Sequence, residues 1–563
     1  MCKRYEEALA DFNKAITLNQ HDSWAIECRG ETYRVSERYE EALADFNRAI
    51  ELDEKDVWAI ASRGQTYAAL ERYEEAIEDF NRAIELDAQY AWAFAGRGEA
   101  YLALKRQEEA LADFTHVIEI DEKDSWIITQ RGRTLHSLGR YEEALTDFNR
   151  AIEINDKFAW AIANRGETFR SMERYEEALA DFNRAIELND KYAWAIANRG
   201  ETFRSMERYE EALADFNRAI ELDDKRGWAF GSRGETYHLM ERHEEALADF
   251  SRAIELDGMD AWTIGSRGEA LRSMQRYNEA IADFNRAVEL NDNLEWVIAS
   301  RGETYRLMER YEEALADFNR AIELNDAYAW AIANRGETFR SMERYEEALA
   351  DLNRAIEIDD RLEGAFASRG ETYRLMERHE EALADLNRAI ELDGMDAWTI
   401  GSRGQALRSM QRYDEAIADF TLAIELDEKL VWPITSRGAT FRAMGLYEEA
   451  LADALRLQEI DPEIVDAHLS LIACYRKLGR MEEYRQQIDL SRALFAEESF
   501  YARACFAALC GDDETALSLL RQALENEEMS IAWILRDPDF DWLKEDPRFA
   551  MLMEEMEAKR NAR

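Results

Sequence analysis

Three residue types recur at a fixed spacing in this sequence, and together they can recognise another protein without covalent chemistry. One set is Trp160, Glu167 and Arg170, and equivalent residues return every 34 positions. Tryptophan and arginine are among the residues most enriched at binding hot spots, and large apolar residues aligned on one exposed face usually mark a partner surface. The candidate binding residues are Trp160, Glu167, Arg170, Trp194, Glu201, Arg204, Trp228, Glu235, Trp262, Glu269, Arg272, Trp296, Glu303, Arg306, Trp330, Glu337 and Arg340. Near-identical copies place function on a repeated surface rather than at one unique centre.

Patterns typical of enzymes are missing from the sequence. The seven histidines form no H-x-x-x-H pair and no cluster with cysteine at metal-ligand spacing. Neither a phosphate-binding G-x-x-x-x-G-K-[ST] loop nor a G-x-S-x-G elbow is present. The Gly96-Arg97-Gly98 segment lies inside a helical pattern, so it does not predict a dinucleotide loop. We therefore expect a non-catalytic protein without a metal or cofactor.

An internal repeat predicts the elements that carry these side chains. The reference unit is residues 159–192, AWAIANRGETFRSMERYEEALADFNRAIELNDKY. Its second half has apolar residues at helical spacing, namely Tyr175, Ala178, Leu179, Phe182, Ala185 and Ile186. Its first half places Ile162, Gly166, Phe169 and Met172 on one face of another amphipathic helix. Each unit is thus predicted to be a helical hairpin, with Gly166 and Ala178 allowing its two helices to approach closely.

A single hairpin of this size cannot bury its own apolar face, so neighbouring hairpins must stack into a solenoid. The 34-residue period, with Gly166, Phe169, Tyr175, Ala178, Phe182 and Ala185, resembles the tetratricopeptide repeat over residues 1–530. The resemblance implies an all-α, right-handed superhelical α-solenoid of helix-turn-helix hairpins. Two departures stand out. Arg165 and its equivalents replace the family's usual leucine, and the closing proline survives only at Pro462.

The period also predicts the organisation of the chain. Residues 1–22 are expected to be a partial repeat with the second helix only, and residues 23–464 to be thirteen regular units. Residues 465–530 are expected to form diverged and degenerate units, followed by a helical cap over residues 531–563. Asp537-Pro538 and Asp546-Pro547 each combine an N-cap acid with proline at the first helical position, which predicts two helix starts in this cap.

The helical period also predicts which way the repeated tryptophans point. Trp160, Glu167 and Arg170 lie opposite the apolar stripe of the first helix. In the family that side lines the concave groove, where peptide ligands usually bind. The alternative is that each tryptophan packs between adjacent units, against Tyr192 or Phe158, while glutamate and arginine pair with each other. Of the family's basic clamp for acidic tails, only Asn164 is compatible, so such a clamp is not expected.

Two further charged rows have structural interpretations. Arg165 and its equivalents lie at the edge of the apolar stripe and are expected to pair with acids such as Asp181, the alternative being an anion-binding row. The acids Glu176, Glu177, Asp181 and Glu187 avoid the apolar stripe and are expected on the convex face. That face is expected to be solvated, with docking of a basic partner as the alternative.

Composition limits the partners and the compartment. The formal net charge of -48 disfavours nucleic acid, because phosphate binding relies on lysine and arginine. Five cysteines without disulfide spacing suit a reducing compartment. No apolar stretch is long enough for a signal peptide or a membrane span. The protein is therefore expected to be cytoplasmic and not bound to a membrane.

These observations predict a scaffold that binds a protein or peptide segment, with basic and apolar residues, along the concave surface. Two alternatives stay open. The first alternative, motivated by the half-unit at Met1, is that the chain is a regulatory or sensing arm of a larger signalling polypeptide. An open amino-terminal face is also expected to allow self-association into a homo-oligomer.

Overall fold

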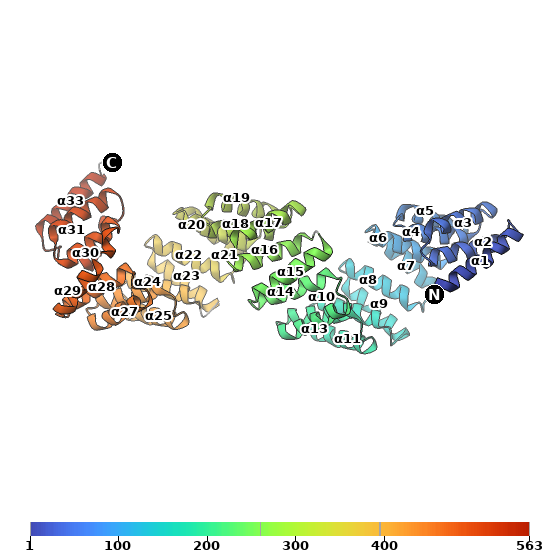
Figure 1. Cartoon of the computed structure of the whole chain (residues 1–563), viewed down its shortest axis with the longest axis horizontal. Helices are drawn as coiled ribbons and strands as arrows, with labels where there is room; N and C mark the ends of the chain where they lie inside the picture. Colours follow the sequence, from blue (N-terminus) through green and yellow to red (C-terminus); the bar gives the residue numbers. More distant parts are fainter. Residues whose placement is uncertain (1, 259, 393–395, 562–563) are drawn as a thin grey trace. The chain divides into compact units, whose positions relative to one another are not determined.

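The structure is a computed structural model that describes residues 2–258, 260–392 and 396–561. The described residues form helices and connecting turns, without a strand. They divide into two compact units, one up to Leu290 and the other from Asn291 onward. Within each unit, helical hairpins follow one another in sequence order (Figure 1). The predicted all-α solenoid of helix-turn-helix hairpins is confirmed.

The first helices of the hairpins share a length of 13 residues. In the unit that ends at Leu290 they are α2 (Ser23–Val35), α4 (Val57–Ala69), α6 (Ala91–Ala103), α8 (Ser125–Ser137), α10 (Ala159–Ser171), α12 (Ala193–Ser205), α14 (Gly227–Leu239) and α16 (Ala261–Ser273). In the other unit they are α18 (Glu295–Leu307), α20 (Ala329–Ser341), α22 (Glu363–Leu375), α24 (Ala397–Ser409), α26 (Val431–Ala443) and α28 (Val465–Lys477).

The second helices carry the stronger apolar stripe. In the first unit they are α1 (Cys2–Leu18), α3 (Tyr39–Leu52), α5 (Tyr73–Leu86), α7 (Gln107–Ile120), α9 (Tyr141–Ile154), α11 (Tyr175–Leu188), α13 (Tyr209–Leu222), α15 (His243–Asp257) and α17 (Tyr277–Leu290). In the other unit they are α19 (Tyr311–Leu324), α21 (Tyr345–Ile358), α23 (His379–Leu392), α25 (Tyr413–Leu426), α27 (Tyr447–Ile460) and α29 (Met481–Ser491).

The carboxyl-terminal part of the chain closes the second unit. Its elements are η1 (Leu494–Ala496), α30 (Phe500–Cys510), α31 (Asp513–Glu525), α32 (Ile531–Arg536), η2 (Pro538–Phe540) and α33 (Pro547–Asn561). The two predicted helix starts are confirmed, since η2 begins at Pro538 with Asp537 accepting from the Asp539 N–H, and α33 begins at Pro547. Leu543, Phe549 and Leu552 are buried there and cover the apolar face of the preceding helices.

Each hairpin turn uses a left-handed residue at the end of its first helix. In the reference unit this residue is Glu173, with φ 58°. The Glu173 N–H donates to Arg170 O, and the Arg174 N–H donates to Phe169 O, both at 2.9 Å. These two bonds satisfy the last carbonyls of α10 in a Schellman arrangement. The turn into the next unit is held by Asn189, whose side chain accepts from the Lys191 N–H, as the Asn/Asp chemistry of this turn predicts.

The core of each hairpin lies where a glycine faces an aromatic ring. A Cβ added at Gly166 would meet Phe182 Cε1 at 3.2 Å, so the two helices pack closely at this level. Phe182 and Ala178 are fully buried, and Ile162 is buried on the facing helix. The close approach predicted from the small residues is confirmed.

The arginine row is a structural clamp. The Arg165 guanidinium donates two bonds to the Asp181 carboxylate, each 2.7 Å long, and a third to Asn149 of the preceding hairpin at 2.6 Å. The predicted pairing of Arg165 with Asp181 is therefore confirmed. The expectation that Asp181 lies on the solvated convex face is wrong, because this carboxylate is 6 % exposed and lies under the guanidinium.

Candidate functional site

The first helices line the inner side of each stack of hairpins. Consecutive first helices, such as α20 and α22, approach each other closely, and no pair of consecutive second helices does so to the same extent among the described residues. When the first helices lie closer together than the second helices, the stack of hairpins curves toward its first helices. The predicted Trp, Glu and Arg positions lie on these first helices, and we call this row of side chains the inner ladder.

Glutamate and arginine of the inner ladder are paired with each other. Arg204 binds Glu201 on its own helix at 2.6 Å and Glu235 on α14 at 2.5 Å. Arg306 on α18 likewise reaches Glu337 on α20 at 3.2 Å. Further pairs within one helix are Arg170–Glu167, Arg272–Glu269, Arg306–Glu303, Arg340–Glu337 and Arg374–Glu371. The charges of the ladder are thus largely balanced internally and connect neighbouring hairpins.

The tryptophans are packed on one side and open on the other. Trp160 lies 5.7 Å from the Phe158 ring and stacks on Trp126 with ring centroids 6.4 Å apart. Trp194 lies against Tyr192 in the same way, at 5.9 Å. The more open members, Trp24, Trp126, Trp262 and Trp398, are 69 %, 39 %, 51 % and 37 % exposed. Packing against Phe158 and Tyr192 therefore exists, yet it leaves apolar surface on the inner side.

A pocket of about 570 Å³ lies on the inner ladder of the first unit. It brings together three predicted residues, Trp160, Glu167 and Trp194. The other lining residues include Arg133 and His136, which stand where most units have glutamate and arginine. Burial lowers the pKa of His136, and the same effect raises the pKa of Tyr192 at the pocket wall to about 12.

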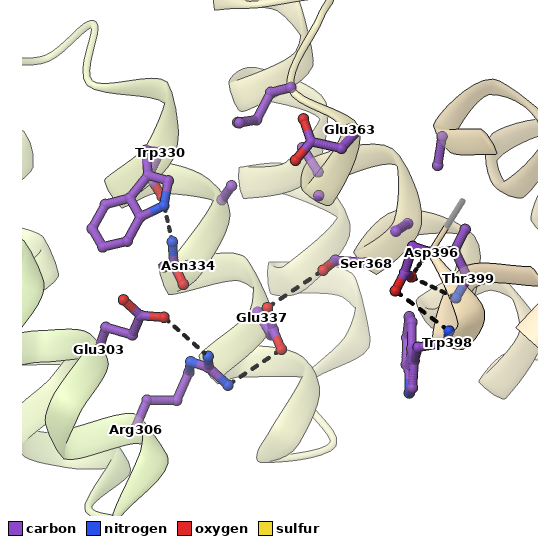
Figure 2. Close-up of a pocket in the computed structure, with 16 residues that line it drawn as sticks. Glu303, Arg306, Trp330, Asn334, Glu337, Glu363, Ser368, Asp396, Trp398 and Thr399 are labelled. Carbon is purple, nitrogen blue, oxygen red and sulfur yellow. Dashed lines mark hydrogen bonds and ion pairs between the residues drawn. The ribbon is translucent and has the colours of Figure 1, made fainter. Parts of the chain in front are cut away.

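A second pocket, of about 430 Å³, lies on the inner ladder of the other unit. It brings together the predicted residues Glu303, Arg306, Trp330 and Glu337. Figure 2 shows Trp330 and Trp398 on two sides of this opening, with the Arg306 and Glu337 pair between them. Glu337 also accepts from the Ser368 hydroxyl of α22 at 3.5 Å.

The remaining predicted residues line neither of these two pockets. They are Arg170, Glu201, Arg204, Trp228, Glu235, Trp262, Glu269, Arg272, Trp296 and Arg340. Among them, the Trp262 indole donates to Glu235 at 2.9 Å, which adds a bond between neighbouring hairpins. The sequence interpretation missed Glu363, Asp396 and Thr399 of the second pocket. The signal that marks this pocket is Gly364, where the regular series of tryptophans is interrupted.

One group of metal-type side chains lies elsewhere in the described residues, at the base of the cap. Atoms of Cys505, Asp537 and Asp539 lie within 4.8 Å of one another. Arg442 binds Asp539 at 2.7 Å, and the Tyr501 hydroxyl donates to Asp537. The Arg442 guanidinium thus pairs with one of the two carboxylates and connects η2 to α26.

Family models match most of residues 30–430. A model described as TPR repeat matches residues 30–71 and 64–105. A model described as tetratricopeptide repeat matches residues 124–191, 157–225, 193–259 and 294–361. Another of the same description matches residues 93–124, 264–294, 364–394 and 400–430. The chain is a tetratricopeptide repeat protein. This membership assigns the TPR protein to the protein-interaction scaffolds, a class that is typically non-catalytic.

Solved structures with the same fold include the APC/C hetero-tetramer Cut9-Hcn1. That match has 12 % identity, covers 82 % of the TPR protein and 98 % of the other chain, and has a TM-score of 0.50. A tetratricopeptide repeat protein from Parabacteroides merdae matches at 20 % identity over 44 % of this chain and 98 % of its own, with a TM-score of 0.39. YrrB, a TPR protein with an unusual peptide-binding site, matches at 28 % identity over 33 % of this chain and 95 % of its own, with a TM-score of 0.29.

Two other comparisons complete the description of the TPR protein. No curated protein matches its sequence. Within the described residues, no helix combines the length and the apolar composition needed to cross a bilayer.

Proposed function

We propose that this TPR protein is a non-catalytic scaffold that binds an extended protein segment along the inner ladder. The observation that carries the proposal is the row of partly exposed tryptophans on the inner side of the stacked first helices. Trp126, Trp262 and Trp398 each keep more than a third of their surface open. Large apolar side chains aligned on one exposed face mark partner surfaces, and tryptophan is the residue most enriched at binding hot spots.

The charge of the protein favours a segment that contains basic residues. The arginines of the inner ladder are already bound to glutamates, as Arg204 is to Glu201 and Glu235. A ligand therefore meets a surface with balanced pairs, inside a protein whose formal net charge is -48. Long-range attraction steers a basic segment toward such a protein, and contacts with the indoles hold it in place.

The proposal is tested by selecting binders from a displayed library of random peptides against the full chain. The selected peptides are then titrated against a variant with Trp126→Ala, Trp262→Ala and Trp398→Ala. We expect an affinity loss of at least about tenfold, the usual consequence of removing hot-spot residues.

The matched control replaces three leucines of similar exposure at the ends of second helices. Leu188, Leu222 and Leu290 are 40 %, 38 % and 38 % exposed, so Leu→Ala changes there remove exposed apolar surface outside the inner ladder. Both variants must keep the helicity of the wild type. If the library yields no binders, or if the leucine variant loses as much affinity as the tryptophan variant, the proposal is wrong.

A further inference from the structure

The tryptophan series of the inner ladder has a single gap, at Gly364. Twelve of the thirteen regular units carry tryptophan at this position, and the unit of α22 carries glycine. A Cβ added at Gly364 would meet nothing within 4 Å. The second pocket, of about 430 Å³, opens at this place, and both neighbouring tryptophans of the series, Trp330 and Trp398, line it. The fold therefore leaves an open space that is lined by two indoles.

Acidic side chains surround this space. The lining includes the carboxylates of Glu303, Glu337, Glu363 and Asp396 and one guanidinium, that of Arg306. The Arg306 guanidinium is engaged by Glu303 and Glu337. The pocket thus carries an excess of negative charge, even though the inner ladder is balanced elsewhere.

Glu363 is the acid most available to a ligand. It is the first residue of α22, it is exposed, and it has no ion-pair partner among the residues that the structure describes. Asp396, in contrast, accepts from the Thr399 N–H at 2.7 Å and caps α24. Figure 2 shows Glu363 on the side of the opening away from the Arg306 and Glu337 pair.

Aromatic walls and an open carboxylate select for one side chain. Arginine has a planar cation that stacks on aromatic faces and whose forked donors match a carboxylate. The Trp330 ring is held against Tyr328 at 6.0 Å, and Trp398 keeps 37 % of its surface open to a ligand. Lysine lacks the flat fork, and an aromatic side chain brings no charge to Glu363.

We propose that the gap at Gly364 is an anchor pocket for an arginine side chain of the partner segment. This inference rests on the proposed function and adds the residue that the segment must present. The pocket of the other unit is the natural contrast, because Arg133 and His136 line it. Arg133 lies over the Trp160 ring at 5.3 Å, so the protein's own guanidinium already occupies that stacking position. The anchor is therefore specific to the Gly364 pocket.

The test uses the full chain with its tryptophan indoles labelled with ¹⁵N, and records the indole signals by NMR. The probes are acetyl-Ala-Ala-Arg-Ala-Ala-amide and the same peptide with citrulline, which keeps the planar shape and removes the charge. Changes of Trp330→Phe and Trp398→Phe assign the two relevant signals. We expect the arginine peptide to shift these two signals, with a dissociation constant on the order of 1 mM, and the citrulline peptide to leave them in place.

Two variants separate the pocket from the rest of the inner ladder. Gly364→Trp restores the residue that the other regular units carry, so folding is preserved while the space is filled, and we expect the shifts to disappear. Glu363→Ala introduces the residue found at Ala329 and Ala397, and we expect binding to weaken about tenfold, as for a lost charge-assisted bond. The matched control is Glu295→Ala, since Glu295 precedes Trp296 where no gap exists.

The outcomes are unambiguous. Loss of the shifts in Gly364→Trp, together with weakening in Glu363→Ala and not in Glu295→Ala, supports the anchor pocket. Equal shifts with the citrulline peptide, undiminished shifts in Gly364→Trp, or no shift of either signal overturns it. None of these three results bears on the peptide-library test of the inner ladder as a whole. The two proposals can therefore fail separately.

Discussion

At the scale of single residues, the Arg165 guanidinium connects two hairpins. It binds the buried Asp181 of its own hairpin and Asn149 of the preceding one. The arginine–aspartate pair recurs from Arg29 with Asp45 to Arg437 with Asp453. A buried ion pair of this kind stabilises a protein little compared with apolar side chains of similar size. Removal of one partner, however, leaves an unpaired charge.

We predict that Asp181→Ala destabilises its hairpin by about 2 kcal/mol, because Arg165 then loses both short bonds while its side chain stays four-fifths buried. Amide hydrogen exchange of α10 and α11 measures this local effect, since repeat arrays open unit by unit. The double variant Arg165→Leu, Asp181→Ala removes the orphaned charge, and we expect it to recover most of the loss. Equal exchange rates in wild type and Asp181→Ala would contradict a stabilising role of the Arg165–Asp181 pair.

His136 is expected to make the stability of the protein depend on pH. Burial lowers the pKa of His136, with Glu167 raising it and Arg170 and Arg133 lowering it further. The unfolded chain therefore takes up a proton at higher pH than the folded chain, and stability falls as pH decreases below the unfolded value of about 6.5. Wild type should lose more stability than His136→Leu between about pH 7.5 and about pH 5.5. Identical losses in denaturant titrations would show that His136 titrates as it does in the unfolded chain.

At the scale of elements, the distance between the two helices of a hairpin is set by glycine facing phenylalanine. The Cβ of alanine at Gly98 would lie 2.7 Å from Phe114 Cε1, whereas at Gly438 the nearest atom is Asp453 Cβ at 3.4 Å. Gly438 has room because Ala454 takes the place of phenylalanine in its hairpin. The same substitution therefore has opposite consequences in two equivalent helices.

We predict that Gly98→Ala destabilises its hairpin by about 1–3 kcal/mol through overpacking. Gly438→Ala should instead stabilise its hairpin by up to about 1 kcal/mol, since alanine has the higher helix propensity. Hydrogen exchange of α6 and α7 in one variant, and of α26 and α27 in the other, measures both. A stabilising Gly98→Ala would mean that the helix separation is not limited by this contact.

Much of the element structure was predictable from the sequence. The apolar spacing around Phe182 predicted the packed helix, and the Asp-Pro pairs predicted two helix starts in the cap, because both depend on local physics. The pairing of Asp181 with Arg165 was also predicted, but the burial of the Asp181 carboxylate was not. A carboxylate on a polar stripe is expected in water, and its burial depends on an arginine that arrives from another helix. The pocket at Gly364 depends similarly on indoles from two neighbouring units.

At the scale of the whole molecule, the carboxyl-terminal cap is fastened by a buried ion pair. Arg442 on α26 reaches Asp539 in η2 at 2.7 Å, with side chains 12 % and 7 % exposed. Burial and the charge of Arg442 together lower the pKa of the nearby Arg408. Asp539 therefore compensates the charge of the buried Arg442 guanidinium.

We predict that Asp539→Ala loosens the cap by about 3 kcal/mol, because it leaves a buried guanidinium without its partner. Faster hydrogen exchange in α33, with unchanged exchange in α20, is the expected result. Asp541→Ala is the matched control, since this acid pairs with Lys544 nearer the surface and its side chain is 49 % exposed. If both variants exchange alike, the ion pair does not fasten the cap.

Binding of a partner segment on the inner ladder is tested by site-specific photo-cross-linking. Benzoylphenylalanine is placed at Trp262 or Trp398 on the inner ladder, and at the exposed Glu244 or Glu380 on second helices. Each protein is irradiated with the peptides selected from the displayed library. We expect cross-links from the two inner positions and none from the second helices. Equal or stronger cross-linking from Glu244 and Glu380 would contradict it.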